Sequence, residues 1–175
     1  MAVYALGDLV PNIDPTAYVH PDAVVIGDVT IGPESSIWPS AVLRGDHGYI
    51  RIGARTSIQD GSILHTTEHW PTLVGDDCVV GHLVHLEGCT VADRVLVGSG
   101  SIMLNRSSAQ NRSVVGAAAL VAEDVDVPSG HLALGVPAKI RPMPDPSVID
   151  TWIDYAVEFY CANAVRFAKE LRRLD

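Results

Sequence analysis

Aliphatic residues recur at every sixth position over about a hundred residues of this chain, with a few interruptions. A period of six does not fit an amphipathic helix, whose apolar stripe follows about 3.6 residues, or a half-buried strand, which alternates every second residue. The repeated positions are Val25, Ile31, Ile37, Leu43, Ile52, Ile58, Leu64, Val74, Val80, Leu86, Val91, Val97, Met103, Ala109, Val115 and Val121. Such a repeat is typical of a solenoid in which each unit forms one short strand and one corner, and three units complete a triangular coil. We therefore predict a mainly β protein, a parallel β-helix with these side chains inside it.

Composition limits the classes of function that this fold can serve. The chain has 175 residues, 47% of them hydrophobic and 19% charged, with a formal net charge of -9. No basic stripe is available to neutralise phosphates, which excludes nucleic acid as a partner. The start of the chain lacks a signal peptide pattern, and no run of about 18 apolar residues occurs, so we predict a cytoplasmic protein with no membrane partner. The three cysteines include no C-x-x-C pair, so neither a disulfide framework nor a thiolate zinc site is expected.

The chain divides into a repeat region and a C-terminal segment. Residues 1–140 are predicted to form the β-helix, and a proline-rich stretch at 141–146 ends it. Residues 147–174 are predicted to form one amphipathic helix, because their apolar residues follow spacings of three and four. These residues are Val148, Trp152, Tyr155, Ala156, Phe159, Tyr160, Ala164, Phe167 and Leu171. Because the stripe is strongly aromatic, we expect it to pack along the prism or on a neighbouring subunit.

The six-residue register also places the polar residues. Side chains at the same position of successive repeats must lie above one another, so each corner of the prism carries its own file of residues. Two such files lie on different edges of one subunit, and in a threefold trimer one edge of a subunit can meet the other edge of the next. The first file holds Arg44, His65 and Glu87, and the second holds Gln59, Asp60 and His82.

Three of the seven histidines fall at outward positions of two adjacent coils. A single histidine on an edge is usually an ordinary solvated side chain, but His65, His82 and His85 lie close to carboxylates in the repeat. Two imidazoles and a carboxylate at a trimer interface suit zinc, which takes three nitrogen or oxygen ligands and leaves a fourth position for water. In this interpretation Arg44 and Asp60 form an ion pair between subunits, and Gln59 holds a metal-bound water.

Several motifs carry a resemblance to a known family. They are Val-Leu-Arg-Gly-Asp at 42–46, Ile-Gln-Asp-Gly at 58–61, Leu-His at 64–65, Pro-Thr-Leu-Val-Gly at 71–75, Val-Gly-His at 80–82, Gly-Cys-Thr at 88–90 and Gly-Val-Pro-Ala-Lys at 135–139. Over nearly its whole length the chain resembles the γ-class carbonic anhydrases. The resemblance implies a left-handed β-helix and a homotrimer with one metal site per interface. The last motif is also shared with hexapeptide acyltransferases.

The family's activity implies a chemistry for these residues. A metal-bound hydroxide would attack carbon dioxide and give bicarbonate. The metal implied is zinc, with iron or cobalt as alternatives. By position, His65 and His82 match two of the metal ligands. The residues that match the surrounding catalytic set are Arg44, Asp46, Gln59 and Asp60.

The third ligand departs from the family pattern. The family places a histidine directly before Gly-Cys-Thr, where this chain has Glu87. Register favours Glu87, because it shares a file with His65, whereas His85 offers the softer nitrogen donor. We predict a site of His65, Glu87 and the neighbouring subunit's His82, with His85 as rival or additional ligand. A carboxylate gives the metal more negative charge and should leave its bound water less acidic, which weakens the case for carbonic anhydrase activity.

The sequence allows other hypotheses of function. A hexapeptide acyltransferase would also be a trimer and would use an interface histidine as general base. A trimer that binds a metal or ligand without catalysis is a third reading, and a fourth gives the metal a purely structural role. If the protein is an enzyme, the candidate proton shuttles are His47, Glu68 and His69, the last two in a loop that interrupts the repeat. Trp70 is predicted to anchor that loop.

Overall fold

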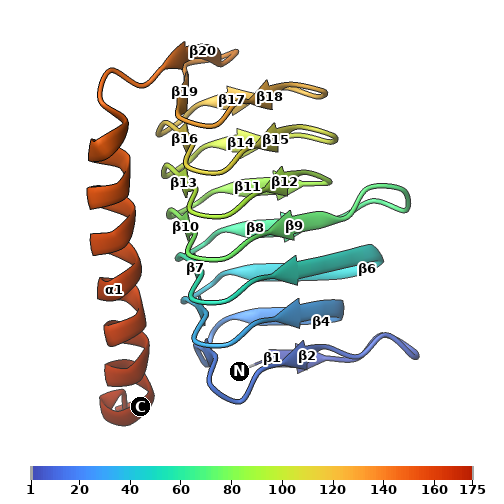
Figure 1. Ribbon diagram of the computed structural model, residues 1–175. Helices are drawn as coiled ribbons and strands as arrows, with labels where there is room; N and C mark the ends of the chain where they lie inside the picture. Colours follow the sequence, from blue (N-terminus) through green and yellow to red (C-terminus); the bar gives the residue numbers. More distant parts are fainter. Residues whose placement is uncertain (1, 175) are drawn as a thin grey trace.

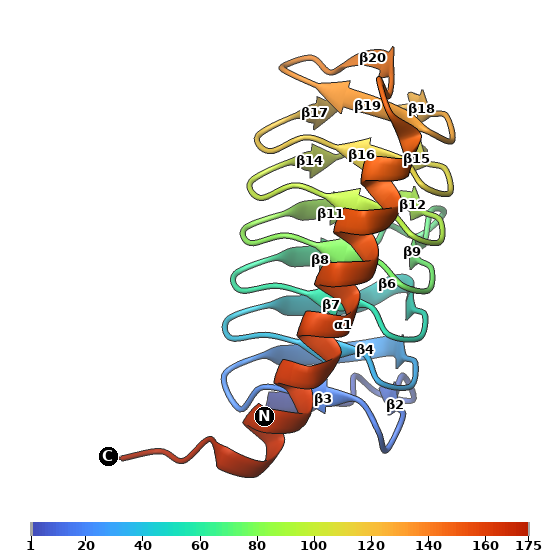
Figure 2. The same cartoon turned by 60° about the vertical axis from the view of Figure 1, so that its left-hand side comes forward.

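The chain forms a left-handed parallel β-helix with one long helix along its side, which confirms the predicted fold class (Figures 1 and 2). The computed structural model describes residues 2–174. Each coil of the prism contributes a strand to three faces, here called A, B and C in the order in which the chain reaches them from the N-terminus. The chain turns between faces at corners AB, BC and CA. All neighbouring strands within a face are parallel, apart from the last pair.

Two long strands bend around corner AB and belong to both faces A and B. They are β4 (Val24–Ile31) and β6 (Val42–Ile52). Face A also holds β1 (Ala2–Tyr4), β8 (Ile63–His65), β11 (His85–Glu87), β14 (Ile102–Met103) and β17 (Leu120–Val121). Face B also holds β2 (Asn12–Ile13), β9 (Thr72–Val74), β12 (Thr90–Val91), β15 (Ser108–Ala109) and β18 (Asp126–Val127).

Face C is a separate sheet that supports the helix. It holds β3 (Tyr18–Val19), β5 (Ser36–Ile37), β7 (Ser57–Ile58), β10 (Val79–Val80), β13 (Leu96–Val97), β16 (Val114–Val115) and β19 (His131–Leu134). Strand β20 (Lys139–Pro142) runs antiparallel to β19 and closes the last coil. Among residues 2–174, no helix has the length and apolar character needed to cross a membrane.

The repeat positions fill the interior of the prism as predicted. All sixteen are at most 3% exposed, and they belong to one continuous core. Successive coils keep the register that the period of six requires; for example, Leu43 pairs with Leu64 and Leu64 with Leu86. Each coil therefore places its polar corner residues directly above those of the coil before it.

Coil stacking explains why glycine follows several repeat positions. A Cβ added to Gly53 would lie 2.2 Å from the Oδ1 of Asp76 and 2.6 Å from the backbone of Gly75 in the next coil. The glycine is needed because two coils approach closely. Most residues with positive φ at the corners are instead non-glycine, including Leu83 with φ of 58° at corner CA. A bulky leucine rarely adopts this conformation.

Helix α1 (Pro146–Glu170) crosses face C from the last coil back to the first (Figures 1 and 2). Its first turn is capped by Asp145, whose side chain accepts the backbone N–H of Ser147 at 2.9 Å. The helix ends four residues before the predicted limit of 174. It packs on its own subunit's prism, on β3, β5, β7 and β10.

The helix packs part of the predicted stripe on the prism, where Tyr160 and Phe167 contact Trp38, and it also buries aliphatics outside that stripe. Ile149, Ile153 and Val157 are buried against face C. Trp152, Tyr155 and Phe159 are 56%, 71% and 48% exposed on this subunit, so for these aromatics packing on a neighbouring subunit stays a prediction. The predicted set omitted Ile149, Ile153 and Val157, whose branched side chains fit the shallow surface of a short-stranded sheet. The side chain of Val148, also in that set, lies outside the described residues.

Ion pairs fix the helix along corner BC. Arg55 donates to Glu158 at 2.7 Å, and Arg94 lies 3.2 Å from Asp150 and 2.8 Å from Asp154. Arg55 and Arg94 occupy the same position of corner BC two coils apart, with Asp77 in the coil between them, so the acidic side of α1 runs along this corner. Burial raises the pKa of Asp150, but hydrogen bonds from Arg94 and Arg112 outweigh this effect and keep the pKa of Asp150 below its usual range.

Replacing Ile153 with alanine is expected to destabilise the protein by about 2 to 5 kcal/mol, because a fully buried aliphatic side chain leaves a cavity between α1 and face C. Urea unfolding followed by circular dichroism measures the loss. Trp152→Ala, one residue away on the exposed side, should change stability by no more than about 0.5 kcal/mol. Equal losses for the two variants would contradict this packing arrangement.

Candidate metal centre

The end of face A brings the first predicted file together. Arg44 of β6 pairs in register with His65 of β8, and His65 pairs with Glu87 of β11. All three side chains point outward, because the residue before each is a core position. The file predicted from the period of six is therefore present, and it lies at corner AB.

Hydrogen bonds link this file into a chain of charged and titratable groups. The His65 Nε2 lies 3.1 Å from Asp46 Oδ1, and its Nδ1 lies 3.3 Å from Glu87 Oε1. The second carboxylate oxygen of Glu87 lies 3.2 Å from His85 Nε2. Arg44 donates to the other oxygen of Asp46. Both nitrogens of His65 therefore face carboxylates, and both oxygens of Glu87 face imidazoles.

These contacts favour the ionised form of both carboxyls. The hydrogen bond from His85 holds the pKa of Glu87 below its ordinary value against the effect of burial, and His65 adds to it. Burial raises the pKa of Asp46, but the hydrogen bond and charge of Arg44, together with the contact to His65, more than offset that effect. The corner thus presents two anionic side chains to the ring of His65.

The second predicted file lies at corner CA, at the other end of strand β11. His82 Nδ1 lies 3.0 Å from Asp60 Oδ2, and both side chains are about half exposed. Gln59 is only 4% exposed. Over residues 2–174, no three His, Cys, Asp or Glu side chains of a single chain are grouped closely enough to hold a metal ion. Arg44 pairs with Asp46 within the chain, and its pairing with Asp60 across an interface stays a prediction.

The loop after β8 lies next to the His65 file. Trp70 stacks under the guanidinium of Arg106, whose Cζ is 4.5 Å from the ring centroid. Arg106 also pairs with Asp124 at 2.6 Å, so the tryptophan rests on a side chain that is itself fixed. The three shuttle candidates, His47, Glu68 and His69, are exposed. A role in proton transfer stays a prediction for all three residues.

Thr72 is a residue of this corner that the sequence pattern did not single out. The hydroxyl of Thr72 donates to the backbone carbonyl of His65 and accepts the N–H of Gly88 at 2.9 Å. Thr72 is fully buried. It occupies an inward-facing position of β9, in register with Ile50, and in the sequence only its place directly after an interrupting loop distinguished it from other strand threonines.

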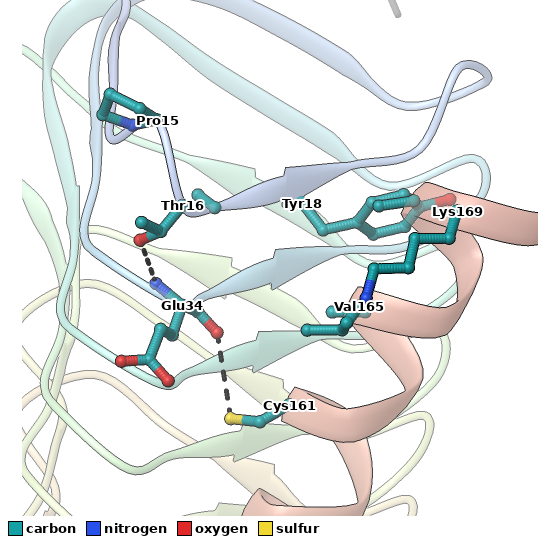
Figure 3. Close-up of a pocket in the computed structure, with 10 residues that line it drawn as sticks. Pro15, Thr16, Tyr18, Glu34, Cys161, Val165 and Lys169 are labelled. Carbon is teal, nitrogen blue, oxygen red and sulfur yellow. Dashed lines mark hydrogen bonds between the residues drawn. The ribbon is translucent and has the colours of Figure 1, made fainter.

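A separate pocket lies where the C-terminal half of α1 meets the first coil. It has a volume of about 220 Å³ and is lined by Thr16, Tyr18, Glu34, Cys161 and Lys169, among others (Figure 3). None of the predicted site residues lines it. Burial raises the pKa of the Cys161 thiol. The other two cysteines, Cys78 and Cys89, are buried in the core.

Comparisons with known proteins place this architecture in a family. The chain is 45% identical to Protein YrdA of Escherichia coli (strain K12) over 146 residues, which cover 79% of each protein. It is 39% identical to Gamma carbonic anhydrase 1, mitochondrial, of Arabidopsis thaliana over 148 residues. That match covers 81% of this chain and 54% of the plant protein, so the chain spans about half the length of this relative.

A solved structure has the same fold over nearly the whole chain. The crystal structure of a hexapeptide transferase family protein from Anaplasma phagocytophilum matches with a TM-score of 0.90 and 34% identity, covering 95% of this chain and 98% of that one. No family model matches the chain. On the identities and coverage of these relatives, the chain belongs to the γ-carbonic-anhydrase-like family of hexapeptide-repeat β-helix proteins.

Proposed function

We propose that this protein is a metal-dependent hydratase of the γ-carbonic anhydrase type, which interconverts carbon dioxide and bicarbonate at the interfaces of a homotrimer. The metal, zinc or alternatively iron or cobalt, is held by His65 and Glu87 of one subunit and His82 of the next. The observation that carries the proposal is the contact between His65 and Glu87 at corner AB, with the third donor at corner CA. A site built this way is complete only between subunits.

The donor atoms at corner AB fit a tetrahedral metal. Bonds of about 2.0 to 2.2 Å around zinc place two ligand atoms about 3.3 Å apart. His65 Nδ1 and Glu87 Oε1 lie 3.3 Å apart. The other nitrogen of His65 faces the carboxylate of Asp46, which is the usual outer contact of a metal-binding histidine. Because His85 contacts the second oxygen of Glu87, we assign His85 as a support for this ligand.

The remaining residues have roles that follow from their contacts. A bound zinc would supply Lewis acidity, which lowers the pKa of water from 15.7 to about 7. Asp46 fixes the ring orientation and tautomer of His65, and Arg44 holds Asp46 in place. At the other corner, Asp60 orients His82. Gln59, which precedes Asp60 in the sequence, is the candidate to hold a water or bicarbonate by hydrogen bonds.

Exposed apolar side chains support an assembly that joins these corners. Ile63 and Ile102 lie on face A on either side of His85, and they are 45% and 38% exposed. Leu83 at corner CA is 71% exposed directly beside His82. Apolar groups that border both halves of a divided polar site are typical of subunit interfaces. A threefold arrangement pairs each corner AB with a corner CA.

Replacing Glu87 with histidine tests the proposed activity. The substitution restores the family ligand and removes a negative charge, so carbon dioxide hydration should rise about tenfold. The pH at which hydration reaches half its maximum should fall, because the remaining donors leave more positive charge on the metal. Stopped-flow hydration assays and elemental analysis of both proteins provide the measurements.

The wild-type protein should carry about one metal per chain. His85→Ala is the matched control, and it should keep its metal if His85 only supports Glu87. Metal loss in His85→Ala, with full metal in Glu87→Ala, would reverse the assignment of the third ligand. Metal without hydration in wild type and in Glu87→His would leave a binding trimer without this catalysis.

A second candidate function is an acyltransferase. The observation that favours it is the high structural similarity to a protein described as a hexapeptide transferase. An acyl-CoA thioester should then raise the melting temperature of the protein in a concentration-dependent way. The hydratase proposal expects no such shift, and it gives the Arg44–Asp46–His65–Glu87 chain a role that a lone general base would not need.

A further inference from the structure

We propose that Thr72 is a positioning residue for the metal centre, which holds the backbone of His65 against the turn that follows Glu87. This inference rests on the proposed function, because it concerns the same pair of ligands. It depends on a single buried hydroxyl that contacts both segments. Thr72 would act through the backbone of the two ligand-bearing strands and would not itself touch the metal or the substrate.

Buried hydroxyls connect successive coils at several corners of the prism in one repeated way. Each donates to a backbone carbonyl of the next coil and accepts the N–H three residues further along. The three examples are Ser35 with Gly53 and Thr56 (2.7 and 2.9 Å), Thr56 with Gly75 and Cys78 (2.7 and 3.0 Å), and Ser62 with Gly81 and Val84 (2.8 and 3.2 Å). These contacts stack regular corners.

Thr72 makes a different connection. Its hydroxyl donates backward to His65, which lies in the same coil on the other side of the loop at residues 66–71. It accepts the N–H of Gly88, which belongs to the next coil. One hydroxyl therefore closes the base of the loop and also joins it to the following coil. The same two contacts fall beside the two ligands that corner AB contributes.

This connection lies where the strand ladder no longer controls the geometry. His65 and Glu87 form the last pair between β8 and β11, and beyond them the chain enters a loop on one side and a turn on the other. Gly88 has a φ of +58°, and a Cβ there would lie 2.2 Å from Asn105 Oδ1. Packing against Asn105 therefore limits the position of the turn at Gly88, and the hydrogen bond to the Thr72 hydroxyl fixes the N–H of the same residue.

The test compares two substitutions at Thr72 with a matched one elsewhere. Thr72→Val keeps the shape of the side chain and removes the hydroxyl, and Thr72→Ser keeps the hydroxyl. Thr56→Val removes an equally bridging hydroxyl at corner BC, away from the ligands. Zinc affinity is measured by competition with a chelator, and hydrogen exchange at the Gly88 amide reports the connection itself.

Thr72→Val is expected to bind zinc about 10- to 100-fold more weakly, with faster exchange at Gly88, while Thr72→Ser remains within about threefold of wild type. Thr56→Val should lose stability and keep its zinc affinity. Unchanged zinc affinity in Thr72→Val with fast exchange at Gly88 would overturn the inference, as would equal zinc losses in Thr72→Val and Thr56→Val.

Failure of the proposed function gives a different result. A wild-type protein that binds no zinc would remove the function, and crystal structures would then decide the role of Thr72 alone. A separation of His65 Nδ1 and Glu87 Oε1 that increases from 3.3 Å in Thr72→Val, and not in Thr72→Ser, would support positioning. An unchanged separation in Thr72→Val would refute it.

Discussion

Trimers assembled from a mixture of His65→Ala and His82→Ala subunits are expected to regain activity that neither variant has alone. Each single variant lacks one ligand at every interface, so its zinc content and carbon dioxide hydration should fall by more than about 100-fold. In mixed trimers, an interface is intact when the subunit that supplies corner AB carries only the His82 change and its neighbour carries only the His65 change. Random assembly of equal amounts makes about one quarter of all interfaces intact, and each mixed trimer has about one intact interface in three.

Co-expression with two affinity tags isolates the mixed trimers for stopped-flow assays and metal analysis. The control mixes His65→Ala with Glu87→Ala subunits. Both residues lie at corner AB, so every interface still lacks one of them, and no activity should return. Recovery in both mixtures, or in neither, would mean that the ligands do not come from two subunits in the proposed way.

Leu83→Asp is expected to convert the proposed trimer to monomers and to remove the metal with it. Leu83 lies beside His82 in a left-handed backbone conformation that a leucine adopts at a cost of about 1 to 3 kcal/mol. We attribute the retention of an exposed leucine in this conformation to a contact with the next subunit. An aspartate there would place a charge in an apolar interface, where a central substitution costs about 2 kcal/mol or more.

Light scattering distinguishes a monomer of 18.7 kDa from an assembly of three times that mass. Val10→Asp is the matched control, because Val10 is also a well-exposed aliphatic residue but lies before the first full coil, where a charge should leave the proposed trimer intact. Leu83→Gly should stabilise the isolated subunit by removing the backbone strain and still weaken assembly. A Leu83→Asp protein that stays trimeric with full metal content would show that corner CA is not an interface.

The sequence predicted the prism well because its core is one-dimensional. A residue such as Leu64 pairs with its equivalents one coil before and one coil after, Leu43 and Leu86, so a spacing in the sequence is enough to locate it. The same register aligned Arg44 with His65 and Glu87. Helix α1 was harder, because one side of it meets two kinds of surface. Ile153 packs on aliphatic side chains of face C and Phe167 packs on Trp38, whereas Trp152 is exposed on this subunit.

The candidate site was only partly predictable for a similar reason. Register gave the outward positions of His65 and Glu87, whereas hydrogen bonds that cross the loop at 66–71 follow from backbone geometry that no spacing encodes. The bridging role of Thr72 is one such feature, and the support that His85 gives Glu87 is another. Whether His82 joins them depends on a second subunit, which the sequence of one chain can only imply.

The path of α1 has a consequence for how the prism comes apart. Stacked repeats that touch only their neighbours tend to fray from their ends, coil by coil. Here the helix leaves the last coil, and its C-terminal half reaches the first, where Phe167 contacts Tyr18 and Trp38. Helix α1 thereby connects the first and last coils of the solenoid through its contacts with face C. Losing either terminal coil means releasing the helix, so the molecule is built to unfold as a single cooperative unit.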